Sequence, residues 1–288
     1  MEHEASGPVE KTRKRRGVPI CVAVCLVVVV VVLAVALALV RRKASSPRQA
    51  PLARKPSDNL KATFIARCKT FKGYDCEKIW NAFTLAYVGR DPCKVPLEAY
   101  DPLIAAAPFK PACNRMIFWS KTEDVVHDFT SKRDCFITLE DTLLGSVLKG
   151  WTWCGKKGSK ETFTTNCPGW TGCENNPFRS FWKRAWAAFS DVACGDVTVM
   201  LNGSISTPFS SASILARIQV KRFNPQTMRS LNVILVTQKN PVANCENASL
   251  KKLKKELGNR IKYTCKEVAE SQIKKCSSNP EKSCRACW

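Results

Sequence analysis

The placement of the cysteines constrains the fold of this 288-residue chain more than any other feature. Sixteen cysteines are present, and fourteen of them follow residue 60. Disulfides form and persist in oxidising compartments, such as the secretory lumen and the cell exterior. Two N-glycosylation sequons, at Asn202 and Asn247, lie in the same part of the chain. The residues after 60 are therefore expected to form a disulfide-rich, glycosylated domain outside the cytosol.

A second constraint is the uncharged apolar run from Val18 to Val40. Its 23 residues would reach about 34 Å as a helix, enough to cross a hydrocarbon core of about 30 Å. Basic residues flank the run on both sides, as KTRKRR and RRK, so charge alone orients it weakly. The alternative is a cleaved signal peptide, with Ala34-Val35-Ala36 or Ala36-Leu37-Ala38 as the cleavage motif. The length of the run favours an uncleaved anchor.

These two features predict the domain organisation. Because the cysteines and sequons require an oxidising lumen, the amino terminus is expected to stay in the cytosol. The chain is then a single-pass type II protein of the plasma membrane. Its predicted parts are a cytoplasmic tail (1–17), a transmembrane anchor (18–40), a stalk rich in basic, Pro, Ser and Ala residues (41–58) and an ectodomain of two subdomains (59–288).

The charge of the chain is strongly positive. The formal net charge is +22, and residues 56–288 contribute 35 Lys and Arg against 21 Asp and Glu. A basic surface attracts anions, including nucleotides, nucleic acid and acidic glycans, but it is equally consistent with a solvated, soluble surface. No nucleic-acid partner is expected from the rest of the sequence. A zinc site has little support, because the only two histidines are His3 and His127.

The apolar patterning predicts an α/β fold. Helical spacing predicts helices over 76–89, 176–194 and 249–261, the last capped by Ser249. Strands are expected over 115–120, 196–203, 213–223 and 231–238. The runs VTVML and VILV are continuously apolar, as in strands buried on both faces of a parallel sheet. We therefore expect a helical amino-terminal part packed on a carboxy-terminal part with a small parallel sheet.

Two adjacent carboxylates, Glu140 and Asp141, lie in the otherwise apolar stretch TLEDTLLG. Thr138 and Asp141 have the spacing of a capping box that begins a helix. Glu140 would then lie in the first helical turn, where the helix dipole favours an acid. The pair can therefore be structural, catalytic or both.

The surrounding motifs resemble one enzyme family. FITLEDTLLGSVLKGWTWCG, together with CNRMIFWSK, NNPFRSFWK and VMLNGS, is similar to the ADP-ribosyl cyclase / cyclic ADP-ribose hydrolase family over about residues 60–288. The resemblance implies an active site in the cleft between the helical part and the sheet. It also implies NAD as the substrate, with no cofactor. Nicotinamide would leave, and adenine or water would capture the oxocarbenium-like ribosyl centre to give cyclic ADP-ribose or ADP-ribose.

The resemblance also assigns roles to individual residues. Trp119 and Trp182 match the two tryptophans that stack on the flat pyridinium, an arrangement that suits a cation. Glu140 matches the acid that contacts the nicotinamide amide and biases cyclisation against hydrolysis. Asp141, beside it, is expected to bind the substrate as well as to form the capping box.

One catalytic position departs from the family. The catalytic glutamate lies about 17 residues after the MLNGS motif, and the residue there is Gln219. Between residues 175 and 245 the only acids are Asp191 and Asp196, which both precede the motif. Gln keeps the shape and hydrogen bonds of Glu but cannot stabilise a cation by charge. Other positions expected in the cleft also differ, namely Ile214, Leu215, Lys149 and Gly150.

Three functions follow. The first is an NAD-consuming ectoenzyme that releases nicotinamide. The second is a catalytically weak or inactive NAD-binding receptor or adhesion ectodomain on the same fold. The third is a basic surface protein that binds acidic glycans. The family motifs favour the first and Gln219 favours the second, whereas the charge only permits the third.

Cysteine connectivity cannot be derived from the sequence. The resemblance implies six bridges: Cys68–Cys76, Cys93–Cys173, Cys113–Cys194, Cys154–Cys167, Cys245–Cys265 and Cys276–Cys284. Cys135 and Cys287 are then left over. They could pair with each other, stay free, or link two chains in a homodimer.

Overall fold

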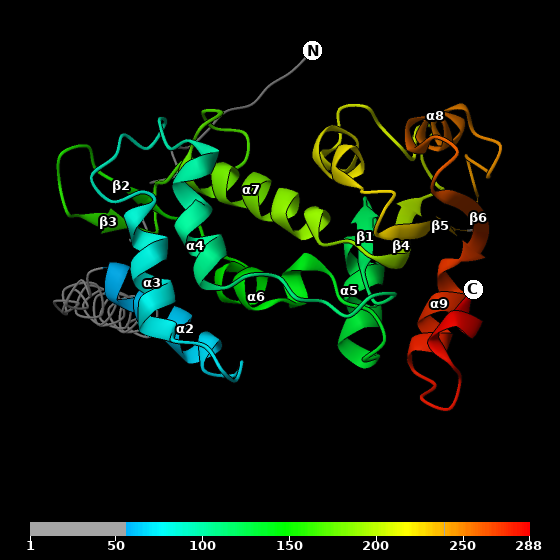
Figure 1. The fold of residues 1–288 in the computed structure, drawn as a ribbon, viewed down its shortest axis with the longest axis horizontal. Coiled ribbons are helices and arrows are strands. Elements are labelled where there is room, and N and C mark those ends of the chain that lie inside the picture. The colour runs from blue at the N-terminus through cyan, green and yellow to red at the C-terminus, as the bar shows by residue number, and fades with distance from the viewer. Residues whose placement is uncertain (1–55, 239) are drawn as a thin grey trace, which may run out of the picture. The chain divides into compact units, whose positions relative to one another are not determined.

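The computed structural model describes residues 56–238 and 240–288 (Figure 1). The predicted tail and anchor, and all but the last three residues of the predicted stalk, lie outside the described residues. Helix α2 (Pro56–Cys68) begins within that stalk. Among the described residues no helix combines the length and apolar character needed to cross a membrane.

Four parallel strands form the main sheet: β1 (Ile117–Ser120), β4 (Gly195–Asn202), β5 (Met228–Thr237) and β6 (Lys262–Ala269), in the order β1-β4-β5-β6. The strands predicted over 115–120, 196–203 and 231–238 are confirmed. Successive residues of β4 enter different cores, since Val199 and Leu201 belong to one cluster and Met200 to the other. The continuous apolar runs are thus explained by burial on both faces.

Different helices cover the two faces (Figure 1). On one face lie α5 (Glu123–Lys132) and α9 (Glu270–Ser277). On the other lies the larger core, which includes α7 (Pro177–Asp191) and α8 (Ala248–Leu257). The helices α2, α3 (Cys76–Leu85), α4 (Asp101–Ala106) and α6 (Leu143–Leu148) contribute to the same larger core. A short hairpin, β2 (Cys154–Gly155) and β3 (Thr162–Phe163), completes the amino-terminal half. The predicted α/β class with a small parallel sheet is confirmed.

The strand predicted over 213–223 is wrong. Leu215–Gln219 forms a π-helical turn, η3, and Val220–Arg222 a 3₁₀ turn, η4. The hydroxyl of Ser213 accepts a hydrogen bond from the backbone N–H of Ala216 at 3.2 Å and so begins the turn. Because a serine oxygen competes well for backbone donors at such positions, the alternating apolar residues do not form a strand.

One strand was missed and one helix cap needs correction. Strand β6 was not predicted, because its sequence KYTCKEVA is rich in charge, as is common at the exposed edge of a sheet. Helix α8 is capped by Asn247 rather than Ser249. The Asn247 carboxamide oxygen accepts a hydrogen bond from the backbone N–H of Ser249 at 2.9 Å.

Seven disulfides use all fourteen cysteines of the described residues. Five are the implied pairs Cys68–Cys76, Cys93–Cys173, Cys113–Cys194, Cys154–Cys167 and Cys245–Cys265.

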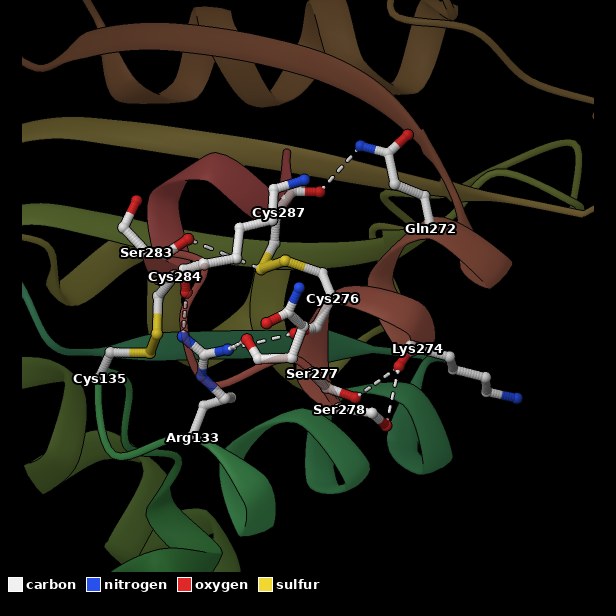
Figure 2. The surroundings of a disulfide bond; sticks show 12 residues. Arg133, Cys135, Gln272, Lys274, Cys276, Ser277, Ser278, Ser283, Cys284 and Cys287 are labelled. Carbon is white, nitrogen blue, oxygen red and sulfur yellow. Dashed lines mark hydrogen bonds between the residues drawn. A yellow bond between two sulfur atoms is a disulfide. The ribbon is translucent and has the colours of Figure 1, made fainter.

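The sixth implied bridge, Cys276–Cys284, is wrong. Cys276 pairs with Cys287, and Cys284 pairs with Cys135 (Figure 2). The Arg133 guanidinium donates hydrogen bonds to the backbone carbonyls of Cys276, Asn279 and Lys282. The loop between Cys276 and Cys284 therefore wraps around this guanidinium. That wrapping carries Cys284 away from Cys276 toward the end of α5 and leaves the fully buried Cys287 beside Cys276. Cys135 and Cys287 are thus neither left over nor paired with each other.

Candidate functional site

A cleft of about 660 Å³ opens where β1 ends. Ligands of parallel sheets bind outside the carboxyl ends of the strands, which is where this cleft lies. Its walls come mainly from four places: β1, residues 139–140, helix α7, and the segment 212–219 that contains η3, with Leu97 and Trp170 besides. The five-residue stretch from Ile117 to Lys121 forms one side of it.

Trp119 and Glu140 meet on that side of the cleft. The indole Nε1 of Trp119 donates a hydrogen bond of 3.3 Å to Oε2 of Glu140. The chain before Glu140 is tied to β1, because the backbone N–H of Ile117 donates to the carbonyl of Ile137 at 3.1 Å. Two segments about twenty residues apart therefore present one aromatic plane and one carboxylate together.

The adjacent carboxylate, that of Asp141, forms a helix cap and does not line the cleft. Asp141 Oδ2 accepts hydrogen bonds from the backbone N–H and the hydroxyl of Thr138, at 2.8 and 2.7 Å. This is the predicted capping box, formed on the 3₁₀ turn η2 (Leu139–Asp141), after which α6 begins. Asp141 is not among the residues that line the cleft. The structure therefore gives Asp141 a capping role and presents only Glu140 to the cleft.

Gln219 lies at the end of η3, in the part of the cleft wall formed by segment 212–219. Its side chain lines the cleft although the residue is only 6% exposed. Ile214 and Leu215 line the same wall, as expected from the sequence. Lys149 and Gly150 do not line it, which corrects their placement in the cleft. The Lys149 carbonyl instead accepts a hydrogen bond from the Arg67 guanidinium at 2.8 Å.

Trp182 is not among the residues lining the cleft either, although it was predicted to stack on the substrate. It is 7% exposed, packs against Phe181 with ring centroids 5.1 Å apart, and its indole N–H has no partner among the described residues. Trp186, one helical turn later, lines the cleft in its place. Its ring lies 5.6 Å from that of Trp170, which also lines the cleft.

The geometry of α7 explains this difference. Arg179, Lys183 and Trp186 are spaced by four and three residues, so they form one stripe along the helix that faces the cleft. Trp182 lies at the edge of this stripe and turns toward the core. The spacing of these three residues is present in the sequence, whereas the family motif indicates Trp182 as the stacking residue.

The cleft is strongly basic. Lys121, Arg179, Lys183 and Arg217 line it, whereas Glu140 is the only acid among the lining residues. The Arg179 guanidinium lies 5.4 Å from the centre of the Trp170 ring. Glu174, just outside, accepts a hydrogen bond from Lys183 at 3.2 Å, and this bond lowers the pKa of the Glu174 carboxyl. The positive electrostatic potential of these four cations attracts phosphates, and the aromatic rings provide a flat apolar surface.

An aromatic and basic cleft at the carboxyl edge of a parallel sheet defines a class of site suited to a nucleotide. Comparison with known proteins specifies the family: the family model for ADP-ribosyl cyclase matches residues 57–285. The chain belongs to the ADP-ribosyl cyclase family.

Individual relatives agree. ADP-ribosyl cyclase/cyclic ADP-ribose hydrolase 1 of Oryctolagus cuniculus is 32% identical over 238 residues, covering 78% of this chain and 80% of the relative. The structure of porcine CD38 with a covalent intermediate is similar with a TM-score of 0.70 and 34% identity, covering 73% of this chain and 96% of that one. The structure of Aplysia cyclase with substrate NGD and product cGDPR gives a TM-score of 0.68 and 26% identity, covering 78% and 96%.

Proposed function

We propose that this chain binds NAD in the cleft between Trp119 and Gln219 and cleaves it much more slowly than relatives that carry a glutamate there. One observation carries the proposal. The cleft has the aromatic, basic and Glu140 components of a dinucleotide site, while Gln219 lines the same cleft at the position where the family resemblance implies the catalytic glutamate. The aromatic rings, the cations and Glu140 support binding of NAD. The missing negative charge at Gln219 supports slow cleavage.

The chemistry explains why that charge matters. Nicotinamide leaves NAD as a neutral molecule from a cationic pyridinium, so its departure needs no general acid. The remaining ribosyl carbon becomes positive and is stabilised by a facing carboxylate, as in retaining glycoside hydrolysis. An amide such as that of Gln219 offers only a dipole. Loss of one preorganised charge-stabilising group typically lowers the rate by about 10²–10³.

The proposed slow cleavage would be a residual enzyme activity. Glu140 still brings one carboxylate to the cleft and holds Trp119 through its hydrogen bond. One carboxylate, matched by resemblance to a contact with the nicotinamide amide, can stabilise the developing cation only partly. The products would then be cyclic ADP-ribose and ADP-ribose, formed slowly. The alternative without turnover is an NAD-binding receptor or adhesion domain.

The proposal includes the predicted setting of the domain. The chain would be a type II plasma-membrane glycoprotein, anchored by residues 18–40, with glycans on Asn202 and Asn247. The seven disulfides support an oxidising location for the folded part. A disulfide-linked homodimer is not included, since the described cysteines are all paired within the chain.

Two measurements on the purified full chain test the proposal. Titration with NAD, followed by tryptophan fluorescence, should show saturable quenching, and ADP-ribose, which lacks the nicotinamide, should quench less. Free nicotinamide should then accumulate about 10²–10³ times more slowly than with a glutamate-bearing relative under the same conditions. Absence of saturable quenching would remove the binding proposal, and turnover as fast as the relative's would remove the assignment of Gln219.

A further inference from the structure

A second surface, separate from the cleft, has the character of a binding site. On the face of the sheet that carries α5 and α9, the strands change from polar to apolar along their length. Ser230 and Asn232 precede Ile234 on β5, and Thr198 precedes Met200 on β4. The helices pack on the apolar half, as Met200 and Ile234 belong to their core cluster. The polar half opens into a groove of about 410 Å³, which we call the polar groove.

The floor of the polar groove is a chain of hydrogen bonds across three strands. The hydroxyl of Ser230 donates to Asp196 Oδ1 at 2.8 Å. The Asn232 amide donates to the Ser230 hydroxyl at 3.2 Å, and its carbonyl oxygen accepts from Thr264 at 2.8 Å. At one end, Arg229 Nε donates to Asp196 Oδ1 at 2.8 Å. These side chains satisfy each other, so the floor is ordered before anything binds.

The rim of the groove is positively charged. Lys262 and Lys266 lie on β6, on either side of Thr264, and all three line the groove. Alternate residues of a strand face the same side, so the two ammonium groups stand on one edge with their Cα atoms about 13 Å apart. Within the described part of the chain neither lysine has an ion pair or side-chain hydrogen bond. Asp196, already paired with Arg229, is the only acid among the lining residues.

The carboxy-terminal segment completes the opposite wall. Arg285 and Trp288 line the groove, and the Trp288 ring packs on Phe129 and Phe136 with centroids 5.0 and 5.4 Å away. The corrected disulfides fix this segment in place, since Cys284 is fastened to Cys135 and Cys287 to Cys276 (Figure 2). Two covalent ties within four residues hold an arginine and an indole against the groove.

The positive surface continues beyond the groove. Lys262 also lines a neighbouring hollow beside α8, together with Lys251, Lys254 and Lys255. Lys251 pairs with Glu246 at 3.1 Å, whereas Lys254 and Lys255 have no ion pair among residues 56–238 and 240–288. The polar groove and this hollow share Lys262 on the edge strand β6, although α8 packs on the other face of the sheet. We call the cations of the two hollows together the basic strip, and they are more numerous than a small anion requires.

We propose that the basic strip binds a sulfated polysaccharide. The cations along the rim suit repeated sulfate groups, the hydrogen-bonding floor suits sugar hydroxyls, and the Trp288 indole offers a flat surface for a sugar ring. Nucleic acid offers the same repeated charge, but the seven disulfides indicate an oxidising compartment where such glycans are the available polyanion. This inference does not depend on NAD binding.

The test measures binding of the purified full chain to heparin over a range of salt concentrations. The double variant Lys262→Gln with Lys266→Gln should bind about 10- to 30-fold more weakly near physiological salt. The slope of log affinity against log salt should fall by about 2, because two ion contacts are lost. Its matched control is Lys69→Gln with Lys157→Gln, which removes the same charge from two exposed lysines of the amino-terminal half.

The control variant should keep at least half of the heparin affinity, and both variants should titrate with NAD as the wild type does. Three outcomes would overturn the proposal: no binding of heparin by the wild type, equal weakening by both double variants, or tighter binding to duplex DNA or phosphatidylserine vesicles than to heparin at the same salt. Equal weakening would mean that net charge, and not the strip, attracts the polyanion.

Discussion

The indole rings of Trp182 and Trp186 lie 5.7 Å apart on α7, yet only Trp186 lines the cleft. The first residue belongs to the core and the second to the surface that a ligand would meet. Within one helical turn, Trp182 therefore packs in the core and Trp186 is available to bind a ligand.

Trp186→Leu should weaken NAD binding by about 1–2 kcal/mol, because it removes a ring available to a cationic pyridinium. Trp182→Leu is the matched change. It should lower the unfolding midpoint, since it truncates a buried ring, but leave the NAD affinity of the folded protein within about twofold. Calorimetric titration well below the unfolding temperature measures both. A larger loss of affinity in the Trp182 variant would mean that the stacking residue is Trp182 after all.

Glu140 should act through the orientation of Trp119 as well as through its charge. Glu140→Leu removes the acceptor of the 3.3 Å bond and should weaken NAD binding by about tenfold, whereas Glu140→Gln keeps an acceptor and should change the affinity by less than about threefold. In a Gln219→Glu background, Glu140→Gln should change the ratio of cyclic to linear product more than the total rate. Chromatography of the products gives both numbers. Equal affinities of the two Glu140 variants would exclude the orienting role.

The network under the polar groove should depend on pH through Asp196. The hydrogen bond from Arg229, followed by that from Ser230, lowers the pKa of the Asp196 carboxyl from 3.8 to about 2. A depressed pKa in the folded state stabilises the protein above the unfolded value, and the contribution is lost as the pH falls from about 4 to about 2. Asp196→Asn should therefore be less stable than wild type at pH 7, with the difference shrinking across that window. Urea unfolding of both proteins at several pH values measures it, and a constant difference would contradict the assignment.

The two carboxy-terminal disulfides can be tested by chemistry. Digestion without reduction, followed by mass spectrometry, should yield peptides linking Cys135 to Cys284 and Cys276 to Cys287. The double change Cys135→Ser with Cys284→Ser should cost about 2–4 kcal/mol of unfolding free energy, since that bridge closes the longest loop of the seven. It should also weaken heparin binding by releasing Arg285. Recovery of a Cys276–Cys284 peptide instead would restore the pairing implied by family resemblance.

Most of the sheet could be predicted, because VTVML and VILV carry no charge and, apart from Thr198, only apolar side chains, which favours burial between two layers. The parts that could not be predicted have physical reasons. Strand β6 is an edge strand whose solvent-facing lysines hide its period. In segment 213–223 the hydroxyl of Ser213 redirects an apolar alternation into a π-helical turn. At the carboxyl end, Cys276, Cys284 and Cys287 are so close in sequence that the wrapping around Arg133 decides the pairing.

The residues of the candidate site also divide into those that the sequence predicted and those that it did not. Trp119, Glu140 and Gln219 were predicted from motifs, and all three line one cleft. Trp186, Arg179 and Lys183 were missed. Their spacing shows that they share one face of a helix, but only the direction of α7 relative to β1 shows that this face meets the cleft. Asp141 and Trp182 carry the same motifs but serve the capping box and the core.

We expect the missing charge at Gln219 to limit cleavage of NAD while binding persists. The direct measurement is the rate of nicotinamide release by the wild type and by Gln219→Glu at saturating NAD, with Gln226→Glu, an exposed glutamine on the nearby loop, as the control for added charge. The account predicts a gain of about 10²-fold for Gln219→Glu, partial because Ile214 and Leu215 also line that wall, and no gain for the control. A wild type as fast as a glutamate-bearing relative, with no change on Gln219→Glu, would contradict it.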